Sequence, residues 1–150
     1  MKMRSFWQRS RYRDTAAPEV LPGVQKKSFA LPFHGGEIWF EHLDGIYQYT
    51  DLVLDKLRRD SGTFLLPSSP ACVGVVLDET LVTGALVGEL ADLLCGGRKT
   101  FLRVCFIGAD RKTARQLRSA LRGRSRFGFA FIDDVEKAKD WLIPAQSSAL

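Results

Sequence analysis

The sequence predicts an α/β fold: a mixed, mainly parallel sheet of about five strands with helices, in the order β-β-α-β-α-β-α-β-α. Three observations support this prediction. After residue 45, short apolar runs alternate with single amphipathic segments, a pattern typical of right-handed crossovers between parallel strands. The run ACVGVVL (residues 71–77) is almost continuously apolar, as expected of a strand covered on both faces. His34-Gly35-Gly36 separates two alternating segments, which indicates a hairpin with an antiparallel first strand at an edge.

The first elements follow from residue 28 onward. FALPF and EIWFEH (29–33 and 37–42) alternate with period two, and Pro32 suits an edge strand. Apolar residues at helical spacing predict a helix from residue 46 that ends at Ser61-Gly62. The apolar strand at 71–78 is then followed by a helix, VTGALVGELADLL, which Gly96-Gly97 closes.

The second half repeats this alternation. FLRVCFIG (101–108) predicts a strand, RKTARQLRSALRG (111–123) a helix and FGFAFID (127–133) the last strand. Asp133-Asp134 offers a cap for the closing helix, VEKAKDWLI, which stops before Pro144. We expect a flexible basic N-terminal tail over 1–27, one domain over 28–145 and a disordered C-terminus over 146–150.

The distribution of apolar residues and cysteines indicates the cellular compartment. No apolar run approaches the roughly 20 residues that cross a bilayer, and the basic N-terminus has no apolar core of a secretory signal behind it. We therefore expect a cytoplasmic protein without a transmembrane segment. Cys72, Cys95 and Cys105 are an odd number and widely spaced, so we interpret them as reduced thiols rather than a metal or redox site.

Charge is divided along the chain. Residues 28–95 carry a formal charge of −7 and residues 96–126 carry +9. Within the basic segment, the predicted helix aligns arginines in one stripe, which Lys112 widens. The stripe consists of Arg111, Arg115, Arg118 and Arg122. It is either a solvated face in contact with internal acids or a docking surface for an anionic partner: an acidic protein surface, a phospholipid headgroup or, least favoured, nucleic acid.

The second half of the sequence also resembles a known family. RVCFIGADRKTARQL, a short basic linker and FGFAFIDDVEKAKDWL are similar to the way in which SpoIIAA-like members of the STAS superfamily close. EIWFEHLDG followed by YTDLVLDKL resembles the opening strand and first helix of that family. The resemblance covers about residues 28–143 and implies a mixed sheet with helices, a regulatory or binding role and no cofactor.

The resemblance bears on the junction Asp78 to Gly84. Phosphorylatable STAS domains carry Asp-Ser-Ser-Gly there, and matching the glycine to Gly84 places Thr83 at the second serine and Val82 at the phosphate acceptor. Valine cannot accept a phosphate, so we expect no switch, although a register shift could bring Thr80 or Thr83 to that position. Asp78 and Thr80 are instead expected to bind free N–H groups at the helix start.

No constellation demands catalysis or a metal. His34 and His42 lack metal-ligand spacing, and Glu37 and Glu41, which could pair as acid and base, are interpreted as solvated strand glutamates. We therefore expect a non-enzymatic, STAS-like regulatory domain that acts through protein–protein contacts, without cofactor or metal. The alternatives are a small-molecule or lipid-binding module at the helix start after the central strand and, more weakly, a hydrolase. The formation of a homodimer is a further alternative that the sequence leaves open.

Overall fold

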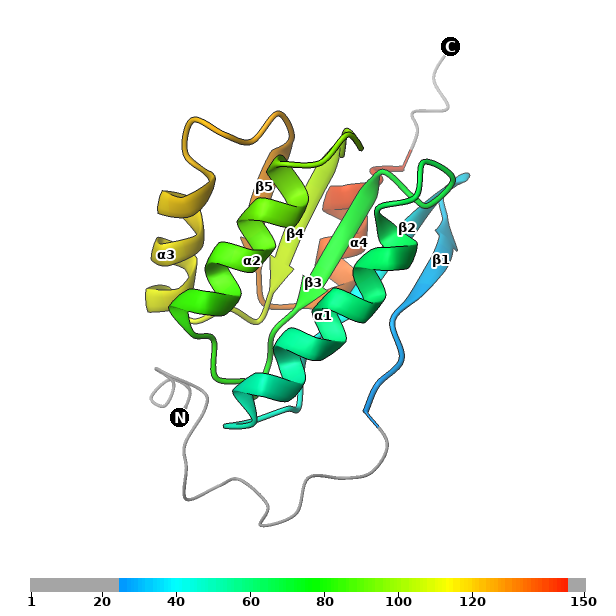
Figure 1. The fold of residues 1–150 in the computed structure, drawn as a ribbon. Helices are drawn as coiled ribbons and strands as arrows, with labels where there is room; N and C mark the ends of the chain where they lie inside the picture. Colours follow the sequence, from blue (N-terminus) through cyan, green and yellow to red (C-terminus); the bar gives the residue numbers. More distant parts are fainter. Residues whose placement is uncertain (1–24, 146–150) are drawn as a thin grey trace.

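The structure, a computed structural model, describes residues 25–145 and has five strands in one mixed sheet with four helices (Figure 1). This confirms the predicted α/β class. The strands are β1 (Phe29–Phe33), β2 (Gly36–His42), β3 (Cys72–Val76), β4 (Arg103–Ile107) and β5 (Gly128–Ile132). The helices are α1 (Thr50–Phe64), α2 (Gly84–Cys95), α3 (Arg111–Leu121) and α4 (Val135–Leu142).

Neighbouring strands in the sheet are also neighbours in sequence. The spatial order is β1-β2-β3-β4-β5; β1 pairs antiparallel with β2, and all other pairs are parallel. His34 and Gly35, both with positive φ (48° and 82°), join β1 to β2, as in the primed turns that match the twist of a hairpin. Because β2 to β5 run in the same direction, their carboxyl ends meet at one edge of the sheet.

The helices cover the two faces of the sheet unequally. α1, α2 and α3 pack on one face, whereas α4 alone packs on the other (Figure 1). Period-two alternation sorts the side chains of β2 between these layers, since Trp39 joins the three-helix side and Ile38 and Phe40 join the α4 side. In the centre of β3, a Cβ on Gly74 would lie 2.8 Å from the ring of Phe40, so only glycine leaves room for this ring.

The predicted end of the first helix is wrong. α1 continues through Ser61 and Gly62 to Phe64, whose side chain is buried. Gly62 has open space around it, and a glycine costs about 1 kcal/mol in a helix, which the burial of one phenylalanine side chain more than offsets. The Nζ of Lys99 then binds three carbonyl oxygens at the helix end, those of Phe64, Leu66 and Ser69, at 2.7–2.9 Å.

The predicted tails lie mostly outside the described residues. Of the N-terminal tail, residues 1–24 are not described, nor are residues 146–150 at the other end. Lys26, within the predicted tail, forms an ion pair of 2.9 Å with Asp44. Within residues 25–145, no helix has the length and apolar character that a membrane span requires.

Candidate functional site

The loop after β3 leads to a capped helix. α2 begins at Gly84, and Thr83 is its N-cap residue, since the Thr83 hydroxyl accepts a hydrogen bond from the backbone N–H of Leu86 at 3.1 Å. Val82, which the sequence resemblance alone matched to a phosphate acceptor, lies beside this cap with an apolar side chain.

Thr80 does not bind the helix start, so that prediction is wrong. Its side chain is buried, donates a hydrogen bond to the carbonyl of Leu43 at 2.6 Å and accepts one from the N–H of Ile46 at 3.0 Å. An isolated parallel bridge also pairs Thr80 with Tyr47. The hydroxyl therefore ties the loop after β3 to the loop after β2, a long-range role that local spacing could not reveal.

Asp78 lies against the end of the next strand. Gly108 follows β4 with a φ of 78°, and a Cβ at this position would overlap the Asp78 carboxylate. A residue with a side chain would thus be strained in two ways, by its backbone conformation and by this contact. Asp78 and Gly108 therefore lie against each other just after the carboxyl ends of β3 and β4.

A cavity of about 290 Å³ opens at this edge of the sheet between the N-termini of α2 and α3. Asp110 caps α3 by accepting a hydrogen bond from the N–H of Thr113 at 2.8 Å. Lys112 is the cation that lines the cavity, and Glu79, with a φ of 56°, lies on its rim. The structure thus brings Thr80, Thr83 and Gly84 to the cavity wall together with Lys112, four of the residues predicted from sequence.

The basic residues of α3 are exposed and form what we call the α3 arginine surface: Arg111, Lys112, Arg115 and Arg118. Arg122 was predicted to continue the stripe but follows the helix end, because α3 ends at Leu121. Arg118 holds its guanidinium carbon 4.9 Å from the ring centroid of Phe131 on β5. This cation–π contact fixes Arg118 beside the outermost strand.

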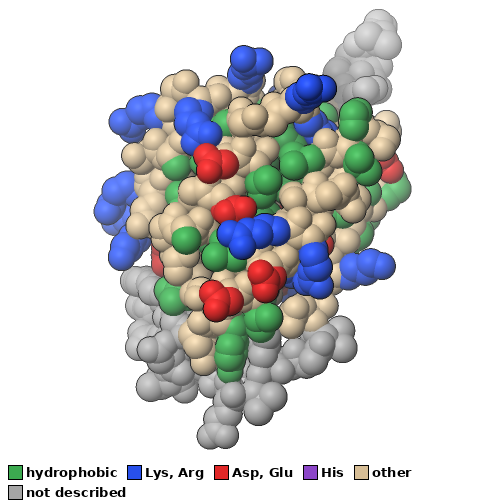
Figure 2. All heavy atoms as spheres, in the orientation of Figure 1, with side chains coloured by type: hydrophobic (Ala, Val, Ile, Leu, Met, Phe, Trp, Pro, Cys, Tyr) green, Lys and Arg blue, Asp and Glu red, His purple; other side chains and the backbone are tan. Residues whose placement is uncertain are grey.

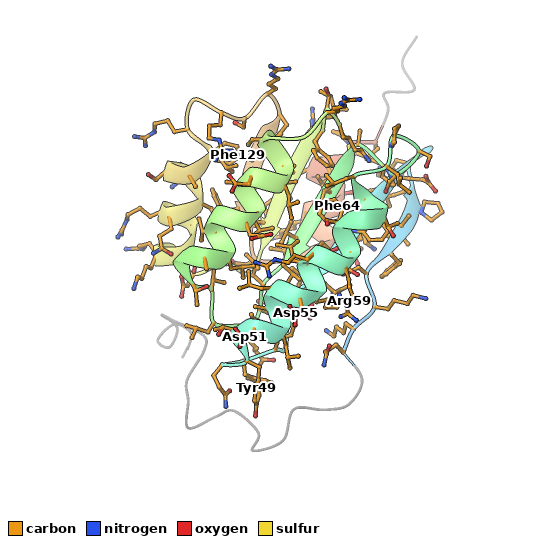
Figure 3. All side chains as sticks on the ribbon, in the orientation of Figure 1. Tyr49, Asp51, Asp55, Arg59, Phe64 and Phe129 are labelled. Atoms are coloured by element: carbon orange, nitrogen blue, oxygen red, sulfur yellow. The ribbon has the colours of Figure 1, made fainter. Side chains whose placement is uncertain are left out.

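Internal acids do not neutralise the α3 arginine surface. Among residues 25–145, none of its members takes part in an ion pair, whereas Arg58 pairs with Glu89 and Arg124 with Asp92. The exposed acids Asp51 and Asp55 lie on α1, and α2 stands between α1 and α3 (Figures 1 and 3). Figure 2 shows Lys and Arg side chains along the left edge and the top of the molecule, whereas over its middle acidic side chains lie next to other basic ones.

Glu41 was wrongly interpreted as a solvated glutamate. Only 1% of it is exposed, because it points from β2 toward the side that α1 covers. Its Oε1 accepts a hydrogen bond from Trp39 Nε1 at 2.9 Å, and its Oε2 has no partner when the group is a carboxylate. Burial, together with Asp60, which accepts a hydrogen bond from the protonated form, raises the pKa of Glu41 to about 8.

Three polar groups surround this buried acid. Lys56 is also buried, and its Nζ lies 2.9 Å from both Asp60 Oδ2 and Ser28 Oγ. Ser28 Oγ donates to the same Asp60 oxygen and accepts from the N–H of His42. Burial alone would raise the pKa of Asp60, but hydrogen bonds from Glu41, Lys56 and Ser28 outweigh it and hold this pKa below its usual value. The signal in the sequence was Lys56 and Asp60 four apart on the helix that covers β2.

The remaining candidates form no reactive site within the described chain. Burial raises the pKa of the Cys105 thiol to about 12 and also raises the pKa values of Cys72 and Cys95, so these thiols stay protonated at neutral pH. Residues 25–145 contain no cluster of His, Cys, Asp or Glu that could hold a metal ion. His34 Nδ1 lies 2.9 Å from the carbonyl of Ile143, so the hairpin turn packs on the end of α4.

Comparison with known proteins gives no relative: no family model, no curated protein and no solved structure matches this chain. Its function is therefore inferred from the geometry of its own residues.

Proposed function

We propose that this chain is a non-enzymatic, STAS-like regulatory domain that binds an anionic surface of a partner protein. The observation that carries the proposal is the α3 arginine surface, whose four exposed cations have no ion-pair partner among the described acids. Like charges spaced three and four residues apart repel by a few tenths of a kcal/mol per pair. An anionic partner would relieve this repulsion and would be steered toward the helix.

The location of these cations supports a docking role over a purely solvated face. One of them, Lys112, lines the cavity at the carboxyl ends of the parallel strands, the edge at which open α/β sheets place their binding sites. The positive ends of the α2 and α3 dipoles point to the same edge. Side chains and helix dipoles therefore attract the same kind of group, one that carries negative charge.

The test is capture of partners from native lysate with the wild-type chain and with Arg115→Gln/Arg118→Gln, with and without phosphatase treatment. Glutamine keeps helix propensity, so stability should change little. The double variant should lose the captured protein, and wild-type capture should weaken as salt shortens the Debye length to about 3 Å at 1 M. Arg59→Gln/Lys137→Gln is the matched control, since it removes two exposed charges from other helices.

Two results would contradict the proposal. Capture by the double variant at wild-type strength across salt concentrations would mean that the arginines do not dock the partner. Ready unfolding of the double variant would mean that the arginines are structural.

A second candidate function is the binding of a small anion or a lipid headgroup in the cavity between α2 and α3. The specific observation is that Lys112 and two helix N-termini line the same cavity of about 290 Å³. Calorimetric titration with inorganic phosphate and with glycerol 3-phosphate separates a free anion from a headgroup. Binding that Lys112→Gln abolishes would favour this function, and absence of heat with both compounds would reject it.

A further inference from the structure

We infer that the partner carries an extended acidic segment, which pairs with the outer edge of β5 as a sixth strand. This inference rests on the proposed function and names the element of the partner that the α3 arginine surface recognises. It starts from the position of β5, which has β4 on one side and no strand of residues 25–145 on the other.

The main chain of β5 offers hydrogen-bonding groups at this edge. The carbonyl of Ile132 accepts a hydrogen bond from the N–H of Gly108 at 3.1 Å, so it points toward β4. Along a parallel strand, successive residues turn their main-chain groups to opposite sides, and therefore the N–H and C=O groups of Phe129 and Phe131 point outward. An added strand would find two donors and two acceptors at the correct spacing.

The two edges of the sheet differ in how they are protected. β1, at the opposite edge, contains Pro32, which has no amide donor, and such residues discourage pairing with another strand. β5 has the sequence GFAFI, with no proline and no charged residue. Only the β5 edge therefore keeps the features that allow strand addition.

Charge complementarity specifies the occupant. Phe129 and Phe131 point toward the three-helix side of the sheet, and Arg118 lies over the ring of Phe131. Arg111 and Arg115 precede Arg118 by seven and three positions on α3, so they share its helical face. A strand placed beside β5 would bring every second side chain to this face. Acidic residues at those alternate positions would meet the arginines, whereas the intervening side chains would turn to the α4 side.

The probe is a heptapeptide of alternating glutamate and valine with a dye on its N-terminus and an amidated C-terminus, and the full chain is titrated into it while the fluorescence anisotropy of the dye is followed. In an extended peptide, all glutamate N–H groups point to one edge and all valine N–H groups to the other. Two further peptides carry N-methyl groups, one on its glutamates and the other on its valines. One of them should bind like the parent and the other about tenfold or more weakly, because its N–H groups can no longer donate to the outward carbonyls of Phe129 and Phe131.

The results separate this inference from the proposed function. Equal binding of the two N-methylated peptides, or no binding of the parent, overturns strand addition. So does self-association of the chain through β5, seen as a dimer in light scattering that Phe129→Pro, which removes an outward amide donor, abolishes. If Arg115→Gln/Arg118→Gln binds the parent peptide with wild-type affinity, the proposed function is wrong. The difference in affinity between the two N-methylated peptides then still shows whether the peptide pairs with β5. A lysine–valine heptapeptide serves as the control for charge and should not bind.

Discussion

Replacement of Glu41 by glutamine should remove a large part of the pH dependence of folding. Between pH 4.5 and about 8, the folded chain holds a proton on Glu41 that the unfolded chain has released. The free energy of unfolding therefore falls as the pH rises through this window. Each unit of pKa difference corresponds to about 1.4 kcal/mol, so the rise from 4.5 to about 8 sets an upper limit of about 5 kcal/mol.

Glutamine preserves the contacts of the protonated acid. Its amide oxygen can accept the hydrogen bond from Trp39, and its amide N–H can donate to Asp60. Asp60 itself has a lowered pKa, so its contribution to stability is lost only as the pH falls below its unfolded value of 3.8, outside the window of Glu41. We expect Glu41→Gln to match the wild type near pH 5 and to exceed its stability by about 2–5 kcal/mol at pH 9.

The assay is urea unfolding followed by tryptophan fluorescence at intervals between pH 5 and pH 9, with linear extrapolation to water. Groups that titrate equally in both proteins cancel in the difference. Glu37→Gln is the matched control, because Glu37 lies on the same strand but is exposed. If the difference between Glu41→Gln and wild type stays within about 1 kcal/mol across this range, Glu41 does not hold its proton and the reasoning is refuted.

Three more changes test the packing around the candidate site. Thr80→Val should lower stability by about 2–5 kcal/mol in urea unfolding, because it leaves two buried backbone groups without partners; a loss as small as that of the exposed Thr100→Val would speak against this role. Gly108→Ala should lower the melting temperature by about 2–8 °C or more, since both the positive φ and the neighbouring carboxylate oppose a side chain, and an unchanged melting temperature would contradict it. Lys99→Met should cost about 1–3 kcal/mol through three lost hydrogen bonds, whereas Lys137→Met should be nearly neutral; equal effects would show that Lys99 does not hold the end of α1.

Local patterns predicted the sheet and its helices but not the buried polar contacts. The alternation of side chains in β2 and the turn at His34 were sufficient to predict the hairpin, because both features depend only on residues that are neighbours in sequence. The same alternation placed Glu41 on the side of Trp39, yet its burial depends on α1 lying over the end of the strand. Thr80 was similarly assigned to the nearest helix start, although its partners lie 34 and 37 residues away. Such contacts follow from tertiary packing, which a single sequence does not display.

The unequal covering of the sheet has a consequence for synthesis on the ribosome. Each strand pairs with the strand made just before it, so β1 to β5 can assemble in the order in which they emerge. The other face of the sheet is covered only by α4, the last helix to be made. Until α4 is in place, the apolar side chains of Ile38, Cys105 and Ile107 on that face are exposed to solvent. A nascent chain stalled before residue 135 should therefore bind an apolar dye or a chaperone, and release it once α4 is complete. Equal dye binding by the stalled and the completed chains would show that the sheet forms only together with α4.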